Sequence, residues 1–153
     1  MVVFGRFGEE KLSSRQNYTG NKFDFRITGY IRNGCNVPIE GVLVDADNGG
    51  GEGTTDANGF YEVWVDSAWS GVVTPGRQHY TFDPNWISYV NVPADQPDQN
   101  YIANNVYDLD CDGFIGWGDV AVMAANWLGT GAGDIDNSGK VDFMDFAAFG
   151  LTW

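Results

Sequence analysis

Two runs of twelve residues decide how the C-terminal third of this chain folds: Asp108-Leu-Asp-Cys-Asp-Gly-Phe-Ile-Gly-Trp-Gly-Asp119 and Asp134-Ile-Asp-Asn-Ser-Gly-Lys-Val-Asp-Phe-Met-Asp145. Each run has oxygen-bearing side chains at positions 1, 3, 5 and 12, a glycine at position 6 and an aliphatic residue at position 8. Alternate side chains of such a loop can point inward around one centre, and the glycine allows a turn that a Cβ would resist. The shared register therefore predicts two closed loops of the same design.

The spacing of these oxygens is that of a twelve-residue calcium loop, because a hard divalent cation takes about 6–8 oxygen ligands at short range. We therefore predict two Ca²⁺ sites, in which the backbone carbonyl at position 7 adds a ligand. Position 9 offers a further carboxylate only in the second loop, so the first site is predicted to bind more weakly. The predicted ligands are Asp108, Asp110, Asp112, the carbonyl of Phe114 and Asp119 in the first loop, and Asp134, Asp136, Ser138, the carbonyl of Lys140, Asp142 and Asp145 in the second.

Each loop is followed by apolar residues at helical spacing, which predicts one short helix after each loop. The first stripe ends at Gly129, and no amphipathic stretch precedes the first loop. We expect two loop-then-helix units, with Ile115 and Val141 pairing the loops through a short β-contact. The stripe residues expected to pack against one another are Val120, Met123, Trp127, Phe146, Phe149 and Trp153.

Residues 108–153 resemble a dockerin module, the duplicated calcium-loop-and-helix domain by which secreted bacterial proteins attach to cohesin modules. The duplication, the Asp at position 12 in place of Glu, and the missing helix before the first loop carry the resemblance. It implies a non-catalytic, calcium-dependent attachment module whose partner is a cohesin-type protein module. A merely solvated pair of acidic loops would not place a helical stripe after both loops.

In the dockerin family, the partner-facing residues lie at positions 10, 11, 17 and 18 of each unit. Those positions often hold Ser-Thr and Lys-Arg pairs, whereas here they are mostly apolar. The resemblance implies a partner-binding face made of Trp117, Gly118, Ala124, Ala125, Phe143, Met144, Gly150 and Leu151. Two other interpretations stay open: this face packs against the chain's own N-terminal domain, or its large residues belong to the small core of the module.

The residues before the loops predict a mainly β domain. Apolar and polar residues alternate from Phe23 to Arg32, and the alternation returns over 42–47 and 60–66. About seven short strands, with turn residues between them and no helical stripe, indicate an antiparallel β-sandwich. The fold class expected for the whole chain is mainly β with a small α part: an immunoglobulin-like or prealbumin-like sandwich followed by the duplicated calcium-loop-helix module.

The sandwich also resembles the carboxypeptidase regulatory-like fold and the collagen-adhesin B-type modules, through Gly34, Pro38–Val44 and Thr55–Tyr61. That resemblance implies a spacer or support for neighbouring modules and says nothing about activity. We expect the sandwich to span residues 21–103, a linker 104–107 and the dockerin-like module 108–153. Residues 1–20 are expected to be the tail of a preceding module or disordered.

Charge and residue inventory argue against several functions. The chain of 153 residues has a formal net charge of −13 and no basic patch that could release counterions from nucleic acid. No apolar run reaches the length of a membrane span. His79 is the only histidine and lies near no serine motif or cysteine pair, and the aspartates are accounted for as ligands, turn residues or the polar strand face. We therefore predict that the chain is not an enzyme.

Aromatic residues make up 15% of the chain and leave carbohydrate binding open. Trp64 shares a predicted strand face with two acidic residues, and Trp69 and Trp86 lie near turns, where an exposed ring can stack on a sugar. Polysaccharide is therefore the alternative partner. In that alternative, the chain is a calcium-stapled structural or carbohydrate-binding unit whose dockerin-like part packs on its own sandwich.

The cysteines and the N-terminus bear on the cellular setting. Cys35 and Cys111 fall in different predicted domains, so a disulfide would have to cross between them; two free thiols are favoured, and both states stay open. The residues from Met1 do not form a signal peptide. Because calcium loops of this kind imply an extracellular setting, we expect a fragment of a larger secreted bacterial protein connected with polysaccharide.

Overall fold

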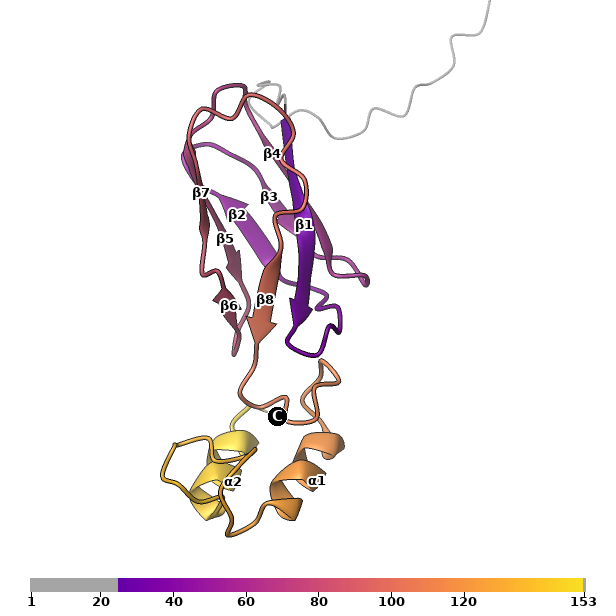
Figure 1. Ribbon diagram of the computed structural model, residues 1–153, viewed down its shortest axis with the longest axis vertical. Helices are drawn as coiled ribbons and strands as arrows, with labels where there is room; N and C mark the ends of the chain where they lie inside the picture. The colour runs from indigo at the N-terminus through magenta and orange to yellow at the C-terminus, as the bar shows by residue number, and fades with distance from the viewer. Residues whose placement is uncertain (1–24, 153) are drawn as a thin grey trace, which may run out of the picture.

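The computed structural model describes residues 25–152, in which two β-sheets lie at one end and two short helices lie at the other (Figure 1). The expectations for residues 1–24 and for Trp153 lie outside the described residues. They concern the preceding tail over 1–20, the first residues of the sandwich and the last residue of the second helical stripe.

Two four-stranded sheets make up the N-terminal part of the described chain. The strands are β1 (Phe25–Asn33), β2 (Leu43–Ala46), β3 (Glu52–Thr54), β4 (Phe60–Val65), β5 (Gly71–Gly76), β6 (Thr81–Asp83), β7 (Ile87–Tyr89) and β8 (Tyr101–Asn104). The first sheet has the order β4-β1-β8-β6 and the second has the order β3-β2-β5-β7. Buried side chains from both sheets form one core, so the arrangement is a β-sandwich, as predicted.

Alternation along the strands places the core between the sheets. β1 buries Ile27 and Ile31, and its antiparallel neighbour β4 buries Tyr61, Val63 and Val65. The register sets Ile27 opposite Val63, so the apolar residues of both strands lie on one face. Each fully buried aliphatic side chain contributes about 1.5–3 kcal/mol, so burial of this face against the second sheet helps hold the two layers together. The alternation predicted for these strands is confirmed.

The sandwich differs from the prediction in two respects. β1 and β8 pair in parallel, with Ile31 opposite Tyr101, whereas an all-antiparallel sandwich was expected. Both strands point toward the helical end in Figure 1, so β8 delivers the chain directly to the C-terminal segment. β3 carries Glu52, Gly53 and Thr54, a run without apolar alternation, and for that reason it is absent from the prediction.

Two helices follow the two loops, as predicted: α1 (Trp117–Ala125) and α2 (Phe143–Gly150). A small core of Met123, Val141 and Phe149 lies between them. Phe146 was expected in this core, but 46% of its surface is exposed, because it lines an open apolar groove beside α1. Within residues 25–152, no helix has the length and apolar character that crossing a membrane requires.

The contact between the loops also differs from the prediction. Val141 forms a parallel bridge with Trp127 and not with Ile115. The chain leaving α1 runs beside the second loop: the Leu128 N–H donates to the Val141 carbonyl at 2.8 Å, and the Val141 N–H donates to the Gly129 carbonyl at 2.9 Å. The end of α1 therefore supports the second loop.

Candidate functional site

The first loop gathers three of its predicted ligands. Carboxylate oxygens of Asp108, Asp110 and Asp112 lie within 4.8 Å of one another. Each of these side chains also accepts a backbone N–H from further along the loop: Gly113 to Asp108 at 3.1 Å, Asp112 to Asp110 at 3.1 Å and Phe114 to Asp112 at 2.8 Å. Gly113 has a φ of +91°, which a residue with a Cβ rarely adopts. The loop is therefore curled around its own carboxylates.

The second loop repeats this pattern with small differences. Asp134, Asp136 and Asp145 bring carboxylate oxygens within 4.8 Å of one another. The two oxygens of Asp134 accept the N–H groups of Ser138 and Gly139, both at 2.9 Å, and Gly139 has a φ of +89°. The Ser138 hydroxyl donates to the carbonyl of Lys140 at 3.2 Å, so these two predicted ligands are neighbours.

The aspartates at position 12 connect each loop to its helix. Asp119 and Asp145 are buried, and each is the third residue of its helix. Asp119 accepts backbone N–H groups from Asp110 at 3.2 Å and Gly116 at 2.7 Å. Asp145 likewise accepts from Asp136 at 3.1 Å and Asp142 at 2.8 Å. In each unit, one aspartate therefore links the backbone of the loop to the first turn of the helix by hydrogen bonds.

The two loops differ in how positions 9 and 12 are used. Asp145 belongs to the carboxylate cluster of the second loop, whereas the cluster of the first loop does not include Asp119. Backbone N–H groups, first that of Asp142, hold the pKa of Asp145 below its ordinary value. Asp142, at position 9, caps α2 by accepting the Met144 N–H at 2.9 Å. One of its oxygens is therefore already engaged.

A buried carboxylate oxygen shows that the first loop suits a cation. Among the described residues, Asp108 Oδ1 is buried without a hydrogen-bond partner, and burial raises the pKa of this carboxyl. A buried anionic oxygen without a partner is costly, and a cation at the centre of the loop would remove that cost. The ligand atoms gathered with it are carboxylate oxygens, which suit Ca²⁺ better than a transition metal. The acidic clusters could each hold a metal ion of this kind.

The eight residues of the predicted partner-binding face are all exposed. Phe143 exposes 76% of its surface, Met144 68% and Leu151 87%. The interpretation that the large residues of this face belong to the small core is therefore wrong, since the core is already filled by three other side chains. Next to Phe143 lies an apolar groove of about 180 Å³, lined by Val120, Met123, Ala124, Trp127, Phe143 and Phe146.

The sandwich contacts the first loop and not the apolar face. A disulfide joins Cys35, in the turn after β1, to Cys111 at position 4 of the loop, with Cα atoms 6.0 Å apart. The expectation of two free thiols was therefore wrong, because the turn and the loop are distant in sequence but adjacent in space. His79 also contacts the ring of Tyr107 edge-on at 5.8 Å. Packing of the apolar face on the sandwich, the other open interpretation, is not seen among the described residues, because the large residues of that face are exposed.

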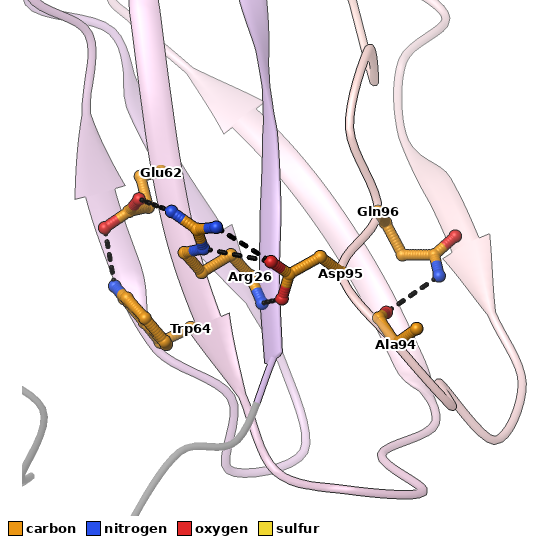
Figure 2. Close-up of polar contacts among 6 residues, drawn as sticks. All are labelled: Arg26, Glu62, Trp64, Ala94, Asp95 and Gln96. Atoms are coloured by element: carbon orange, nitrogen blue, oxygen red, sulfur yellow. Dashed lines mark hydrogen bonds and ion pairs between the residues drawn. The ribbon is translucent and has the colours of Figure 1, made fainter.

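Of the three tryptophans considered for the carbohydrate-binding alternative, two are engaged within the sandwich. Figure 2 shows Arg26 between Glu62 and Asp95, with the Trp64 Nε1–H donating to Glu62 at 2.7 Å. The Arg26 guanidinium also lies 5.6 Å from the centre of the Trp64 ring. Trp69 is buried, with 7% of its surface exposed, so its ring is not open to a sugar. Only Trp86, which is 55% exposed, keeps an open ring among these three.

Comparisons with known proteins give a structural likeness at low sequence identity. No protein-family model matches the chain, and no curated protein matches it. The chain is similar to a chain in the crystal structure of a C-terminal interface mutant of a type II cohesin–X–dockerin complex from Acetivibrio cellulolyticus, with 18% identity over 84% of this chain and 94% of that chain and a TM-score of 0.42. An N-terminal interface mutant of that complex gives 16% identity, the same coverage and a TM-score of 0.38. Likeness at this level establishes neither a shared family nor a shared function.

Proposed function

We propose that residues 108–153 bind two Ca²⁺ ions and, in that form, attach the chain to a cohesin-type protein module. In this proposal the chain is not an enzyme: residues 21–103 serve as a spacer, residues 104–107 as a linker, and the whole belongs to a secreted bacterial protein connected with polysaccharide. The observation that carries the proposal is the pair of matched loops, each of which gathers three aspartates and is hydrogen-bonded through position 12 to the helix that follows.

The small core of the helical end explains why a cation would be needed for order. Three buried apolar side chains contribute about 1.5–3 kcal/mol each, whereas every ordered residue costs about 1–2 kcal/mol of backbone entropy. Bound calcium would supply positive charge to the clustered carboxylates. The buried aspartates at position 12 would then transmit loop closure to α1 and α2, so folding of this segment and metal binding are coupled.

The ordered helices present the surface that would bind the partner. Phe143, Met144 and Leu151 are large, apolar and exposed, and the groove beside Phe143 offers a pocket for a side chain of the partner. Exposed apolar patches bordered by polar residues are typical of protein interfaces. The apolar character of the face indicates a partner with an apolar contact surface.

The test is calcium and cohesin binding by a double variant, Asp108→Ala with Asp134→Ala. Isothermal titration should show two calcium equivalents on the wild-type chain, and the variant should lose both. A panel of bacterial cohesin modules should include one that the wild-type chain binds in calcium and releases in excess chelator. The control is Glu40→Ala with Glu52→Ala, which removes two exposed charges from the sandwich. Cohesin binding that survives in chelator would contradict the proposal.

A second candidate function is a calcium-stapled structural unit. The disulfide between Cys35 and Cys111 favours it, because it fixes the first loop on the chain's own sandwich. In this case calcium binding would stabilise the whole chain, and no cohesin of the panel would bind. The carbohydrate-binding version keeps Trp86 as its candidate ring, and unchanged tryptophan fluorescence across a set of soluble polysaccharides would exclude it.

A further inference from the structure

We propose that the sandwich positions the first calcium loop, through Asn33 and the Cys35–Cys111 disulfide, so that calcium affinity at this loop depends on a turn that lies outside it. The proposal rests on the calcium-binding function proposed above. It makes Asn33 a positioning residue for Asp108, the ligand at position 1.

Asn33 connects the end of β1 with the first loop. Its side chain is buried, with 8% of the residue exposed. The Nδ2 group donates to the carbonyl of Cys111 at 3.0 Å and makes a longer contact of 3.5 Å with Asp108 Oδ2. The Oδ1 atom accepts the N–H groups of Cys35 at 3.0 Å and Val37 at 2.9 Å. One amide therefore fixes the turn after β1 and holds two residues of the loop.

Further contacts hold the loop at its glycine. Gly113, at position 6, is buried, and a Cβ there would lie 3.2 Å from Val37 and 3.6 Å from Ile39. The Tyr80 hydroxyl lies 3.4 Å from the carbonyl of Gly113 and donates to it. Together with the disulfide at Cys111, these contacts restrain positions 1, 4 and 6 of the loop from the sandwich side.

The second loop is ordered in a different way. Its hydrogen bonds to Asp134 and Asp136 come from Ser138 and Gly139 within the loop, and its further support comes from the chain after α1. Residues 136–140 are all exposed. The contacts described for the second loop do not come from the sandwich, so this loop serves as an internal reference for the first.

Restraint from the sandwich should raise calcium affinity at the first loop, because a loop held near its bound shape loses less conformational freedom on binding. This gain would offset the carboxylate that position 9 lacks, where the first loop has Gly116. Coupling between two events is reciprocal, so calcium in the first loop should in turn protect the disulfide against opening.

The experiment follows the backbone N–H signals of Gly113 and Gly139 by nuclear magnetic resonance during calcium titration of the full chain, since each N–H lies within its own loop. The variants are Asn33→Ala and the pair Cys35→Ser with Cys111→Ser, and the control is Ser88→Ala, an exposed position on β7. We expect calcium affinity reported by Gly113 to fall about tenfold in both variants, or about 1.4 kcal/mol. The affinity reported by Gly139 should stay within twofold.

A second measurement uses only the wild-type chain, so its result does not depend on whether a variant folds. The disulfide is opened with a thiol reductant, in calcium or in chelator, and the free thiols are counted by alkylation and mass spectrometry. We expect opening to be about tenfold slower in calcium; equal rates would overturn the proposal.

The outcomes separate this inference from the function on which it rests. If both glycine signals respond to calcium and neither variant weakens the first loop, the inference is wrong and the proposed function stands. If neither signal responds in the wild-type chain, calcium binding itself is wrong, and the inference is overturned with it.

Discussion

Gly118 has two roles at the scale of the residue. It occupies position 11, on the predicted partner-binding face, and it also makes room for a predicted calcium ligand: a Cβ at this position would overlap the Asp110 carboxylate. The resemblance to dockerins assigns this position to the partner, whereas the structure shows that it also shapes the first loop. Gly150, at position 17 of the second unit, is a glycine of the same predicted face on α2; it is exposed as well, but a Cβ there would meet nothing within 4 Å.

Gly118→Ala should therefore weaken calcium binding at the first loop, because Asp110 would have to move. We expect a loss of about tenfold in affinity, equivalent to about 1.4 kcal/mol, by calorimetric titration. Gly150→Ala is the matched control, which should keep calcium affinity and leave the helix equally or slightly more stable. Equal calcium affinity in the two variants would show that Asp110 is not a ligand in the position observed.

Asp56 gives a prediction for pH that is independent of calcium. Its carboxylate accepts the N–H groups of Asn58 at 2.8 Å and Phe60 at 2.9 Å, and the Phe60 bond is the main cause that lowers the pKa of Asp56 below 3.8. A carboxyl with a lowered pKa binds fewer protons in the folded state, so it stabilises the fold above pH 3.8 and loses this effect as pH falls through the lowered pKa.

Asp56→Asn should accordingly lower the melting temperature of the sandwich at pH 6 and make a smaller difference at pH 2.5. Thermal melts in excess chelator, followed by near-ultraviolet circular dichroism, would measure both. If the difference in melting temperature between the wild-type chain and the variant grows on acidification, the Asp56 carboxylate is not what stabilises the turn before β4.

At the scale of the element, the two helices are too short to be stable alone. α1 has nine residues and α2 has eight, and isolated helices below about 12–15 residues are marginal in water. Neither helix has a basic residue in its last turn to offset the helix dipole. Their stability must come from the three-residue core and from the aspartates at position 12.

Chelation of calcium should consequently melt α1 and α2 while the sandwich stays folded. Far-ultraviolet circular dichroism should lose its helical contribution in excess chelator and recover it on addition of calcium. The near-ultraviolet signal of the buried Trp69 should change little. Helical signal retained in chelator would show that the helices do not depend on the metal.

The helices and strands also show which parts of the fold could be predicted from local sequence patterns and which could not. Loop register and helical spacing predicted both helices, and alternation predicted β1 and β4, because these signals lie within a single run of sequence. The parallel pairing of β1 with β8 joins residues such as Ile31 and Tyr101 that no local pattern connects. The disulfide and the contacts of Asn33 were missed for the same reason: each depends on two segments that only the folded chain brings together.

At the scale of the whole molecule, the predicted partner-binding face and the contact with the sandwich use different residues of the C-terminal segment. The first loop contacts the sandwich, while Phe143, Met144 and Leu151 remain exposed.

The double variant Phe143→Ser with Leu151→Ser should therefore reduce cohesin binding by about 100-fold, as expected for central apolar contacts, and leave calcium affinity unchanged. Surface plasmon resonance would measure binding, with Val90→Ser, an exposed apolar position of the sandwich, as control. Unchanged cohesin affinity would place the interface elsewhere.

The disulfide between Cys35 and Cys111 also changes the path that mechanical tension would take through the chain. A pull on the C-terminus reaches Cys111, crosses to Cys35 and continues along β1, so the stretch between the two cysteines carries no load. This stretch covers a sequence separation of 76 residues, or roughly 25 nm of extended chain. In single-molecule extension, that length should be released only after reduction, and the oxidised sandwich should act as an inextensible tether.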